Sequence, residues 1–227
     1  MKMKNKRLIA LDGVDASGKQ THAQLLYQRL QSEGYPVRLL SFPAYAEPSS
    51  VLVKMYLSGD FGEKPEDVNA YAASSFFAAD RFATFRTDWK RDYENGVILI
   101  ADRYVSSNMI HQAGKIKDEA ERDRFLNWLD NLEYVVYGIP RPDMTLFLDM
   151  PPEFGRILMS DRQNKFDNSA GKDIHERDAA YLEESYHNAC VVAQKYNWQH
   201  ISCVCRGQIR DIDDIQAEIY GFIRQIL

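Results

Sequence analysis

The chain has few cysteines, no excess of positive charge and no long apolar run, and each shortage excludes a class of protein. Only three of its 227 residues are cysteines, and no histidine stands near them at the spacing of a zinc finger, so we expect reduced thiols. The net charge of -5 leaves no broad basic face for nucleic acid. No apolar run approaches the roughly 18 residues that a membrane span needs, and we therefore expect a cytoplasmic protein without a membrane segment.

Apolar residues make up 45% of the chain and charged residues 27%, which suits one globular domain with a full core over residues 1–227. Short apolar or β-rich runs alternate with segments of helical periodicity. Fully apolar strands separated by helices are typical of a parallel sheet covered on both faces, in a three-layer α/β/α fold. The expected strands are residues 8–11, 37–42, 97–101, 145–148 and 200–204, and the expected helices are residues 19–33, 66–93, 118–133, 152–161, 174–196 and 211–226. Ligands of such sheets bind at the carboxyl ends of the strands.

The stretch LDGVDASGKQT ends the first expected strand and opens the first helix. It contains Gly13, Gly18 and Lys19 in the spacing of a phosphate-binding P-loop. The glycines of such a loop let backbone N–H groups approach phosphates, which the lysine then reaches. A glycine-rich turn that only joins a strand to a helix would not explain the lysine. We therefore predict a P-loop fold with a five-stranded parallel sheet, and the expected ATP ligands are Gly13, Asp15, Ala16, Ser17, Gly18, Lys19, Gln20 and Thr21.

Gln20 stands where most P-loops have a Ser or Thr, whose hydroxyl helps to hold Mg²⁺. Gln20 offers only an amide oxygen on a longer arm, and Thr21 follows about 100° further around the helix. The order G-K-x-T resembles the loop of nucleoside monophosphate kinases such as adenylate kinase, in which phosphate oxygens and waters hold most of the metal. We expect a working loop of that kind, with Gln20 as a candidate metal ligand.

Asp102 ends the third expected strand and Arg103 follows at once, in the stretch VILIADRYVSSN. A carboxylate at this edge can hold Mg²⁺ or its water shell, and a guanidinium can offer a phosphate two parallel hydrogen bonds. The alternative is a pair that only caps a strand, but its position beside a P-loop favours a functional role. We therefore predict that Asp102 binds the metal and that Lys19, Asp102 and Arg103 act in catalysis.

Residues for a second substrate follow the second expected strand and lie on the long helix. Phe42-Pro43 can form a hydrophobic wall or a simple turn, while Phe77 and Arg81 stand four residues apart and share a helix face. A ring and an arginine on one face can clamp a nucleobase. Alternatively, Arg81 pairs on the surface with Asp80 or Asp88, and the periodicity leaves both readings open. The neighbouring Phe76 lies on the apolar stripe and is expected in the core.

Taken together, these motifs resemble the thymidylate kinase family, which transfers a phosphate from ATP to dTMP. The resemblance runs almost from end to end, through LDGVDASGKQT, SFP, FFAADRF, ADRYVSS and PRPDMTLFLDMPPE. It implies a homodimer that uses ATP and Mg²⁺. It also implies roles for single residues: Asp15 near the 3′-hydroxyl, Phe77 stacked on thymine, Arg81 bonded to its O4 edge, Asn108 near the base, Arg103 on the acceptor phosphate and Asp102 on the metal. Phe42, Pro43, Tyr45, His111 and Gln112 complete the expected acceptor site.

The chain departs from the family pattern at three places. Ala44-Tyr45 occupy a region in which the family often has a phosphate-binding arginine. His111 replaces an aromatic residue, often Tyr, that packs near the sugar. Ala16 stands where some members have a catalytic arginine inside the loop, so the missing charge is expected to come from a mobile lid.

The polar stretch 159–178 is expected to be a lid that closes over ATP, although a solvated loop has the same composition. Its predicted catalytic and ATP-binding cation is Arg162, with Lys165 and Lys172 as further candidates and Glu176 on the metal or acceptor side. Gly207 and Gln208, after the last expected strand, are candidates for contact with adenine.

The acceptor in such a reaction needs no general base, because a phosphate monoester with a second pKa of about 6 is already mostly ionised at pH 7. The predicted reaction is therefore in-line phosphoryl transfer that depends on positioning and charge neutralisation. Two alternatives stay open: a kinase of another nucleoside monophosphate or a deoxynucleoside, and a catalytically weak homologue that binds nucleotide.

Overall fold

A single parallel sheet organises the protein, whose residues 6–159 and 174–227 are described by a computed structural model. The strand order is β2-β3-β1-β4-β5, with β1 at the centre. The strands are β1 (Arg7–Asp12), β2 (Val37–Ser41), β3 (Ile98–Asp102), β4 (Met144–Asp149) and β5 (Gln199–Ser202). Ile9 of β1 lies opposite Ile100 of β3 and Met144 of β4. The predicted five-stranded parallel sheet is therefore confirmed.

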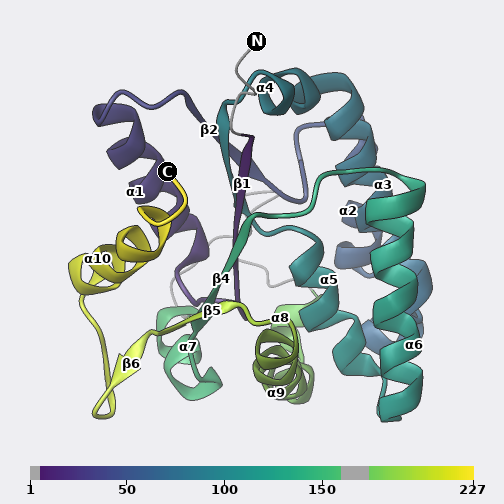
Figure 1. Ribbon diagram of the computed structural model, residues 1–227. Coiled ribbons are helices and arrows are strands. Elements are labelled where there is room, and N and C mark those ends of the chain that lie inside the picture. Colours follow the sequence, from purple (N-terminus) through teal and green to yellow (C-terminus); the bar gives the residue numbers. More distant parts are fainter. Residues whose placement is uncertain (1–5, 160–173) are drawn as a thin grey trace.

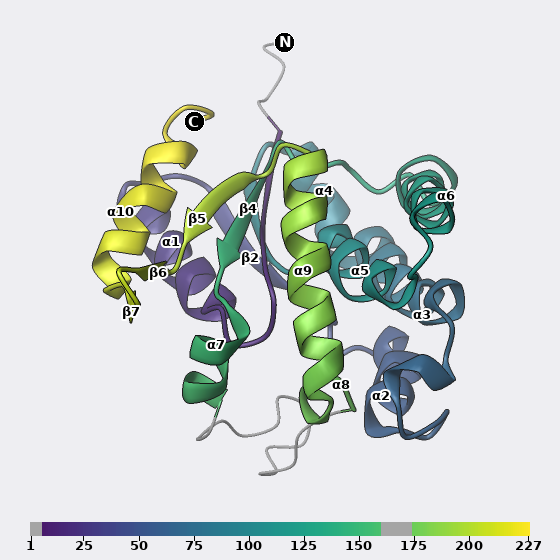
Figure 2. The same ribbon diagram turned by 90° about the horizontal axis from the view of Figure 1, so that it is seen from below.

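Helices cover both faces of this sheet, because successive strand residues point to opposite sides. On one face Ile9 and Leu11 pack with α1 (Lys19–Ser32) and α10 (Ile212–Ile223). On the other face Leu8 and Ala10 join a second apolar cluster. That face is covered by α3 (Ala70–Thr84), α5 (Val105–His111), α6 (Glu119–Asp130) and α9 (Ala179–Lys195), as Figures 1 and 2 show from two directions. The predicted three-layer arrangement is thus observed.

Short elements connect these layers. They are α2 (Val51–Ser58), α4 (Lys90–Glu94), α7 (Pro152–Met159), α8 (Ile174–Arg177), the 3₁₀ turns η1 (Pro48–Ser50), η2 (Pro65–Asp67) and η4 (Ala113–Lys115), the π-helical segments η3 (Phe85–Trp89) and η5 (Asn131–Val136), and the hairpin of β6 (Val204–Cys205) and β7 (Gln208–Ile209). No helix in the described ranges has the length and apolarity to cross a bilayer. The three cysteines are free thiols.

Capping residues explain where the helices differ from the sequence prediction. The helix expected from residue 66 begins at Ala70, because the side chain of Asn69 accepts a hydrogen bond from the backbone N–H of Ala72. The helix expected over 174–196 is divided at Asp178, whose side chain caps α9 by accepting from Tyr181 N. The short helices α2 and α5 were not predicted at all.

Candidate active site

The loop between β1 and α1 has the backbone geometry of a phosphate cradle. Gly13 has φ 154°, and a Cβ atom there would lie 2.6 Å from the carbonyl oxygen of Leu148 in β4, so a larger residue would displace the strand. Gly18, at φ 81°, precedes α1, and its position leaves the first turn of the helix without a capping side chain. The N–H groups of this turn carry partial positive charge and have no intrahelical acceptors. The loop can therefore bind an anion.

Lys19 lies across this loop and is only 5% exposed. Its Nζ donates to the carbonyl oxygen of Val14 at 2.6 Å and to the hydroxyl of Ser17 at 3.2 Å. Burial, together with the nearby charge of Arg103, lowers the pKa of Lys19 to about 7. An anion in the loop would favour the charged form of this lysine.

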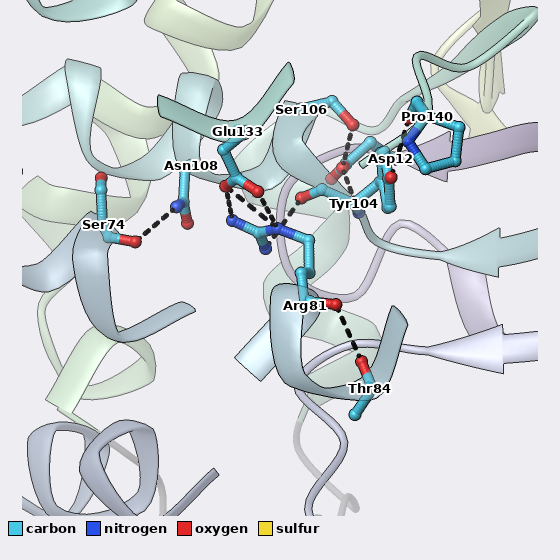
Figure 3. Close-up of polar contacts among 9 residues, drawn as sticks. All are labelled: Asp12, Ser74, Arg81, Thr84, Tyr104, Ser106, Asn108, Glu133 and Pro140. Carbon is cyan, nitrogen blue, oxygen red and sulfur yellow. Dashed lines mark hydrogen bonds and ion pairs between the residues drawn. The ribbon is translucent and has the colours of Figure 1, made fainter. Parts of the chain in front are cut away.

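The buried carboxylate of Asp12 ties the loop to α5. It accepts hydrogen bonds from Gly13 N at 3.0 Å, from Ser106 Oγ at 2.6 Å and from Ser107 Oγ at 2.8 Å, and Figure 3 shows its contact with Ser106. α5 in turn carries Asn108 and His111. The phosphate loop and these two predicted acceptor residues are therefore held in one rigid unit, a role for Asp12 that the sequence reasoning missed.

Arg103 lies between the loop and α5, with a left-handed backbone at φ 68°. Its Nη2 forms an ion pair with Asp15, while its Nη1 donates to Ser107 Oγ at 3.3 Å and lies 3.2 Å from His111 Nε2. Burial would raise the pKa of Asp15, but the combined attraction of Arg103 and other nearby groups, Lys19 among them, outweighs it and holds that pKa far below its usual range. Two predicted site residues, Asp15 and Arg103, are thus brought into direct contact.

Asp102 is the better placed of the two predicted metal ligands. It lies at the end of β3 with 4% exposure, and its Oδ1 has no hydrogen-bond partner among the described residues. An oxygen that is buried, anionic and unpaired suits the ligand preference of Mg²⁺. Gln20, the second metal candidate, is exposed on α1. The structure thus supports Asp102 more strongly than Gln20.

The predicted acceptor residues gather around one pocket next to the loop. All ten of them line it: Asp15, Phe42, Pro43, Tyr45, Phe77, Arg81, Arg103, Asn108, His111 and Gln112. Leu57, Ser107 and His175, which were not predicted, line it too. The pocket has a volume of about 70 Å³.

Helix α3 supplies one wall of this pocket and also fixes the loop opposite. The carboxylate of Asp80 accepts from Ala44 N at 2.8 Å and from Ser49 Oγ at 2.5 Å, which ties the segment after β2 to the helix. Phe77 packs edge-on against Tyr56 with ring centroids 6.2 Å apart. Phe76 is half-buried against the same cluster, in line with its expected core role.

The alternative that Arg81 pairs on the surface with Asp80 or Asp88 is wrong. Arg81 is 2% exposed and forms an ion pair with the buried carboxylate of Glu133. Asp88 instead pairs with Arg38. Arg81 therefore belongs to the interior, at the wall of the pocket.

Two histidines meet at the pocket. The rings of His111 and His175 are nearly parallel, at 16°, with centroids 6.1 Å apart. Because an arginine can only donate, Nε2 of His111 accepts from Arg103, and its proton is on Nδ1. That Nδ1 is buried and finds no acceptor in the described part of the chain. Burial lowers the pKa of His111 to about 3, so a neutral ring offers one N–H to a ligand.

A half-buried lysine, Lys115, lies next to these residues. Lys115 Nζ donates to the hydroxyl of Tyr56 at 2.8 Å and to the carbonyl oxygen of Val68 at 3.1 Å, and the Tyr56 hydroxyl also lies 2.8 Å from His175 Nε2. Burial lowers the pKa of Lys115 from 10.5 to about 7. Lys115 is therefore connected to α2 through Tyr56, and through Tyr56 to His175 of α8. Among the described residues no carboxylate is hydrogen-bonded to this lysine.

This shift predicts a pH dependence of stability. Between pH 7 and 10.5 the unfolded chain keeps a proton on Lys115 that the folded protein has released, so stability rises with pH by up to about 1.4 kcal/mol per unit. The Lys115→Met variant should lack this contribution. Urea unfolding at pH 7.5 and 9.5 would measure it, with Lys195→Met, which changes an exposed lysine, as the control. An equal difference between wild type and Lys115→Met at both pH values would contradict the expectation.

A second cavity, of about 390 Å³, opens on the other side of the phosphate loop. Thr21 and His22 of α1 line it together with Ile209, Arg210 and Ile212 from the segment after β5. Gly207 and Gln208, predicted to lie near adenine, are exposed in the β6–β7 hairpin, and the residues that follow them line the cavity. Their contact with adenine stays a prediction.

Some predicted residues cannot be placed. Arg162, Lys165 and Lys172 lie outside the described residues. Both flanks of that stretch are described: α7 packs on the phosphate loop through Gly155, whose Cβ would lie 3.3 Å from Asp15 O, and α8 carries His175 into the pocket.

The residues that the sequence reasoning missed carried signals of different strength. Asp12 is a carboxylate at the end of an apolar strand, which is the same signal that identified Asp102. Glu133 follows the buried Phe125 and Leu129 at four-residue steps, so the periodicity alone marks a charged residue in a core position. His175 had no such signal, because its contacts depend on how α8 packs.

A parallel P-loop sheet with a buried loop lysine, next to a pocket with a paired arginine, defines a P-loop phosphotransferase. The comparisons narrow this class. The sequence model described as Thymidylate kinase matches residues 11–201, and the chain belongs to the thymidylate kinase family, as its motifs predicted.

Similar proteins come from distant organisms. The thymidylate kinase of Mycobacterium tuberculosis is 30% identical over 175 residues, which are 76% of this chain and 78% of that protein. The one from Danio rerio is 24% identical over 221 residues, 97% and 91% of the two chains. The solved structure of thymidylate kinase from Candida albicans has the same fold, with a TM-score of 0.72 and 22% identity over 97% of this chain and 92% of that one.

Proposed function

We propose that this protein transfers the γ-phosphoryl group of ATP to dTMP, giving dTDP and ADP. The observation that carries the proposal is the junction of the two sites: Arg103 of the acceptor pocket forms an ion pair with Asp15 of the phosphate loop, and the buried Lys19 of that loop is close enough to attract the same carboxylate. Membership of the thymidylate kinase family supports the identity of the substrates.

In the proposed reaction the donor lies in the phosphate loop. Backbone N–H groups of residues 13–18 and the start of α1 hold the phosphates, and Lys19 turns from Val14 O toward them. The adenine occupies the cavity beside Thr21 and His22. Arg162, Gly207 and Gln208 stay predictions as further ATP contacts.

Arg103 holds the acceptor phosphate in line with the donor. Its guanidinium is charged and pre-positioned by Asp15 and Ser107, so little reorganisation is needed as charge develops. The acceptor oxygen is already ionised at neutral pH, and no base is required. Asp102, with its unpaired Oδ1, would hold Mg²⁺, which supplies charge neutralisation on the transferring phosphoryl group.

The other residues of the pocket bind the nucleoside part of the acceptor. Phe77 stacks on the base, Arg81 and Asn108 bond its edge, and Asp15 approaches the 3′-hydroxyl. The buried N–H of His111 is available to a sugar or phosphate oxygen. These roles follow from the lining of the pocket and from the family pattern.

A coupled assay of ADP release tests this function. We expect ATP with Mg²⁺ to support turnover on dTMP, with lower rates on dUMP, UMP and dCMP and none on thymidine. Comparable rates on UMP would mean that His111 does not select the sugar. No turnover on any acceptor, together with tight nucleotide binding, would identify a catalytically weak homologue.

We also propose a homodimer located in the cytoplasm. The support for a dimer, beyond the family pattern, is an apolar surface of Phe82, Val135 and Val136, the last two 67% and 65% exposed. Sedimentation should give twice the monomer mass of 26.2 kDa. Val135→Asp should shift the equilibrium toward monomer, since it places a charge on this surface. A monomeric wild type would refute the proposal.

A further inference from the structure

Arg81, which lines the acceptor pocket, forms a fully buried ion pair with Glu133 behind it. Nε of Arg81 lies 3.1 Å from both carboxylate oxygens of Glu133, and its Nη2 bonds to Oε1. Nη1 donates to the carbonyl oxygen of Tyr104 at 3.4 Å. Figure 3 shows the guanidinium held between Glu133 and Tyr104, with Asn108 to one side. The orientation of Arg81 is therefore fixed before any ligand binds.

Stability does not explain this pair. Burial of two charges costs several kcal/mol per ion, and apolar residues of similar volume often give an equal or more stable fold. Glu133 is 0% exposed, so bulk solvent does not reach its charge. The position of the pair at the pocket points to a role in recognition.

The hydrogen bonds leave Arg81 with a defined set of donors. A guanidinium has five N–H groups and no acceptor. The bonds to Glu133 and Tyr104 use one N–H each on Nε, Nη2 and Nη1, so one remains on each Nη. A ligand atom that bonds to Arg81 must be an acceptor.

Asn108, unlike Arg81, offers the ligand an acceptor. Its Nδ2 donates to the carbonyl oxygen of Ser74 at 3.3 Å, as Figure 3 shows. Because a carbonyl can only accept, the amide cannot turn over without losing this bond. Among the described residues no donor is bonded to Oδ1 of Asn108, which therefore remains for a ligand N–H.

We infer that Glu133 and the Ser74 carbonyl determine the base selectivity of the pocket, by fixing a donor on Arg81 and an acceptor on Asn108. This inference rests on the proposed function. A pyrimidine with a carbonyl next to a ring N–H, the edge shared by thymine and uracil, satisfies both residues. Glu133 is a positioning residue, since it acts through Arg81.

Cytosine presents the reverse pattern, an amino donor beside a ring acceptor. Its amino group would meet the donors of Arg81, and its ring nitrogen would meet Oδ1 of Asn108. Each buried mismatch costs about 1–3 kcal/mol, or roughly 5- to 150-fold. With two such mismatches, we expect wild-type kcat/KM to be at least about 25-fold higher for dUMP than for dCMP.

The test is Glu133→Gln, which keeps the size of the side chain but turns an N–H donor toward Arg81. The ratio of kcat/KM for dUMP to that for dCMP should fall at least about tenfold. KM for dTMP should rise with kcat nearly unchanged, because the contact is equal in the ground and transition states. KM for ATP should stay constant.

The matched control is Asp130→Asn, the same chemical change at an exposed carboxylate that faces Arg141 through two hydrogen bonds. It should leave the dUMP to dCMP ratio unchanged. If Glu133→Gln does not fold, the double variant Arg81→Met with Glu133→Met removes both charges, and it should fold with the selectivity lost.

The outcomes separate this inference from the proposed function. Wild type that phosphorylates dTMP but uses dCMP as well as dUMP would overturn the inference alone, as would a folded Glu133→Gln variant with wild-type selectivity. Wild type without activity on dTMP would refute the proposed function. Calorimetric titration with dUMP and dCMP would then still test the inference, which predicts tighter binding of dUMP.

Discussion

Replacement of Lys19 by alanine is expected to lower kcat about 10³-fold while the protein stays folded. The lysine is hydrogen-bonded to the loop backbone, and removal of a charged donor from a closed site costs a large part of the transition-state stabilisation. The fold should tolerate the change, because burial has already lowered the pKa of Lys19 to about 7 and its charged form is costly to bury.

Steady-state kinetics with dTMP and ATP would measure this loss, and thermal unfolding would check the fold. Lys195→Ala is the control, since Lys195 is an exposed residue of α9 that pairs with Asp123. If Lys19→Ala keeps the wild-type kcat, the phosphate loop does not take part in catalysis and the assignment is wrong.

Replacement of Arg103 by alanine is expected to lower kcat/KM for dTMP by about 10³-fold. Arg103 also forms an ion pair with Asp15. Without Arg103 the Asp15 carboxylate loses its strongest attracting charge, so the pKa of Asp15 rises and the protein becomes less stable. Arg103→Lys keeps a charge near Asp15 but loses the planar fork. We expect it to remain folded with kcat/KM reduced about 100-fold.

The two variants separate chemistry from folding. Arg141→Ala, which breaks an exposed pair with Asp130, should leave the kinetics unchanged. If Arg103→Lys has normal kinetics with dTMP, the acceptor phosphate is held by another residue, and the position of Arg103 beside Asp15 serves the fold instead.

The sheet could be predicted from the sequence because its strands are buried on both faces. Runs such as residues 8–11 and 97–101 are apolar throughout, which few other structures allow. The short helices were harder. α5 has seven residues, too few for a clear periodicity, and its Ser106, Ser107 and Asn108 bond to Asp12 and Ser74 across the fold. Its helical form depends on tertiary contacts.

Residues at strand ends could likewise be predicted, because parallel strands bring their carboxyl ends to one edge. Asp102, Arg103 and the loop around Lys19 were found in this way. Glu133 lies 52 residues further along the chain than Arg81, and no local sequence pattern connects the two residues. Such a pair depends on the packing of η5 against α3, which a single sequence does not encode in any periodicity.

The substitution of His111 for the aromatic residue of the family also has a physical explanation in the structure. A charged histidine next to Arg103 would be repelled, but burial lowers the pKa of His111 to about 3 and keeps the ring neutral. The neutral ring stacks with His175 and accepts a bond from Arg103. It can thus replace a flat aromatic side chain while it adds one N–H.

The most direct test of phosphoryl transfer to dTMP is to follow the label from ATP carrying ³²P at the γ position. After incubation of the full chain with dTMP and Mg²⁺, chromatography should place the label in the β-phosphate of dTDP, with formation dependent on dTMP. Label found only in inorganic phosphate, or dTDP formation absent at every dTMP concentration, would contradict the proposed reaction.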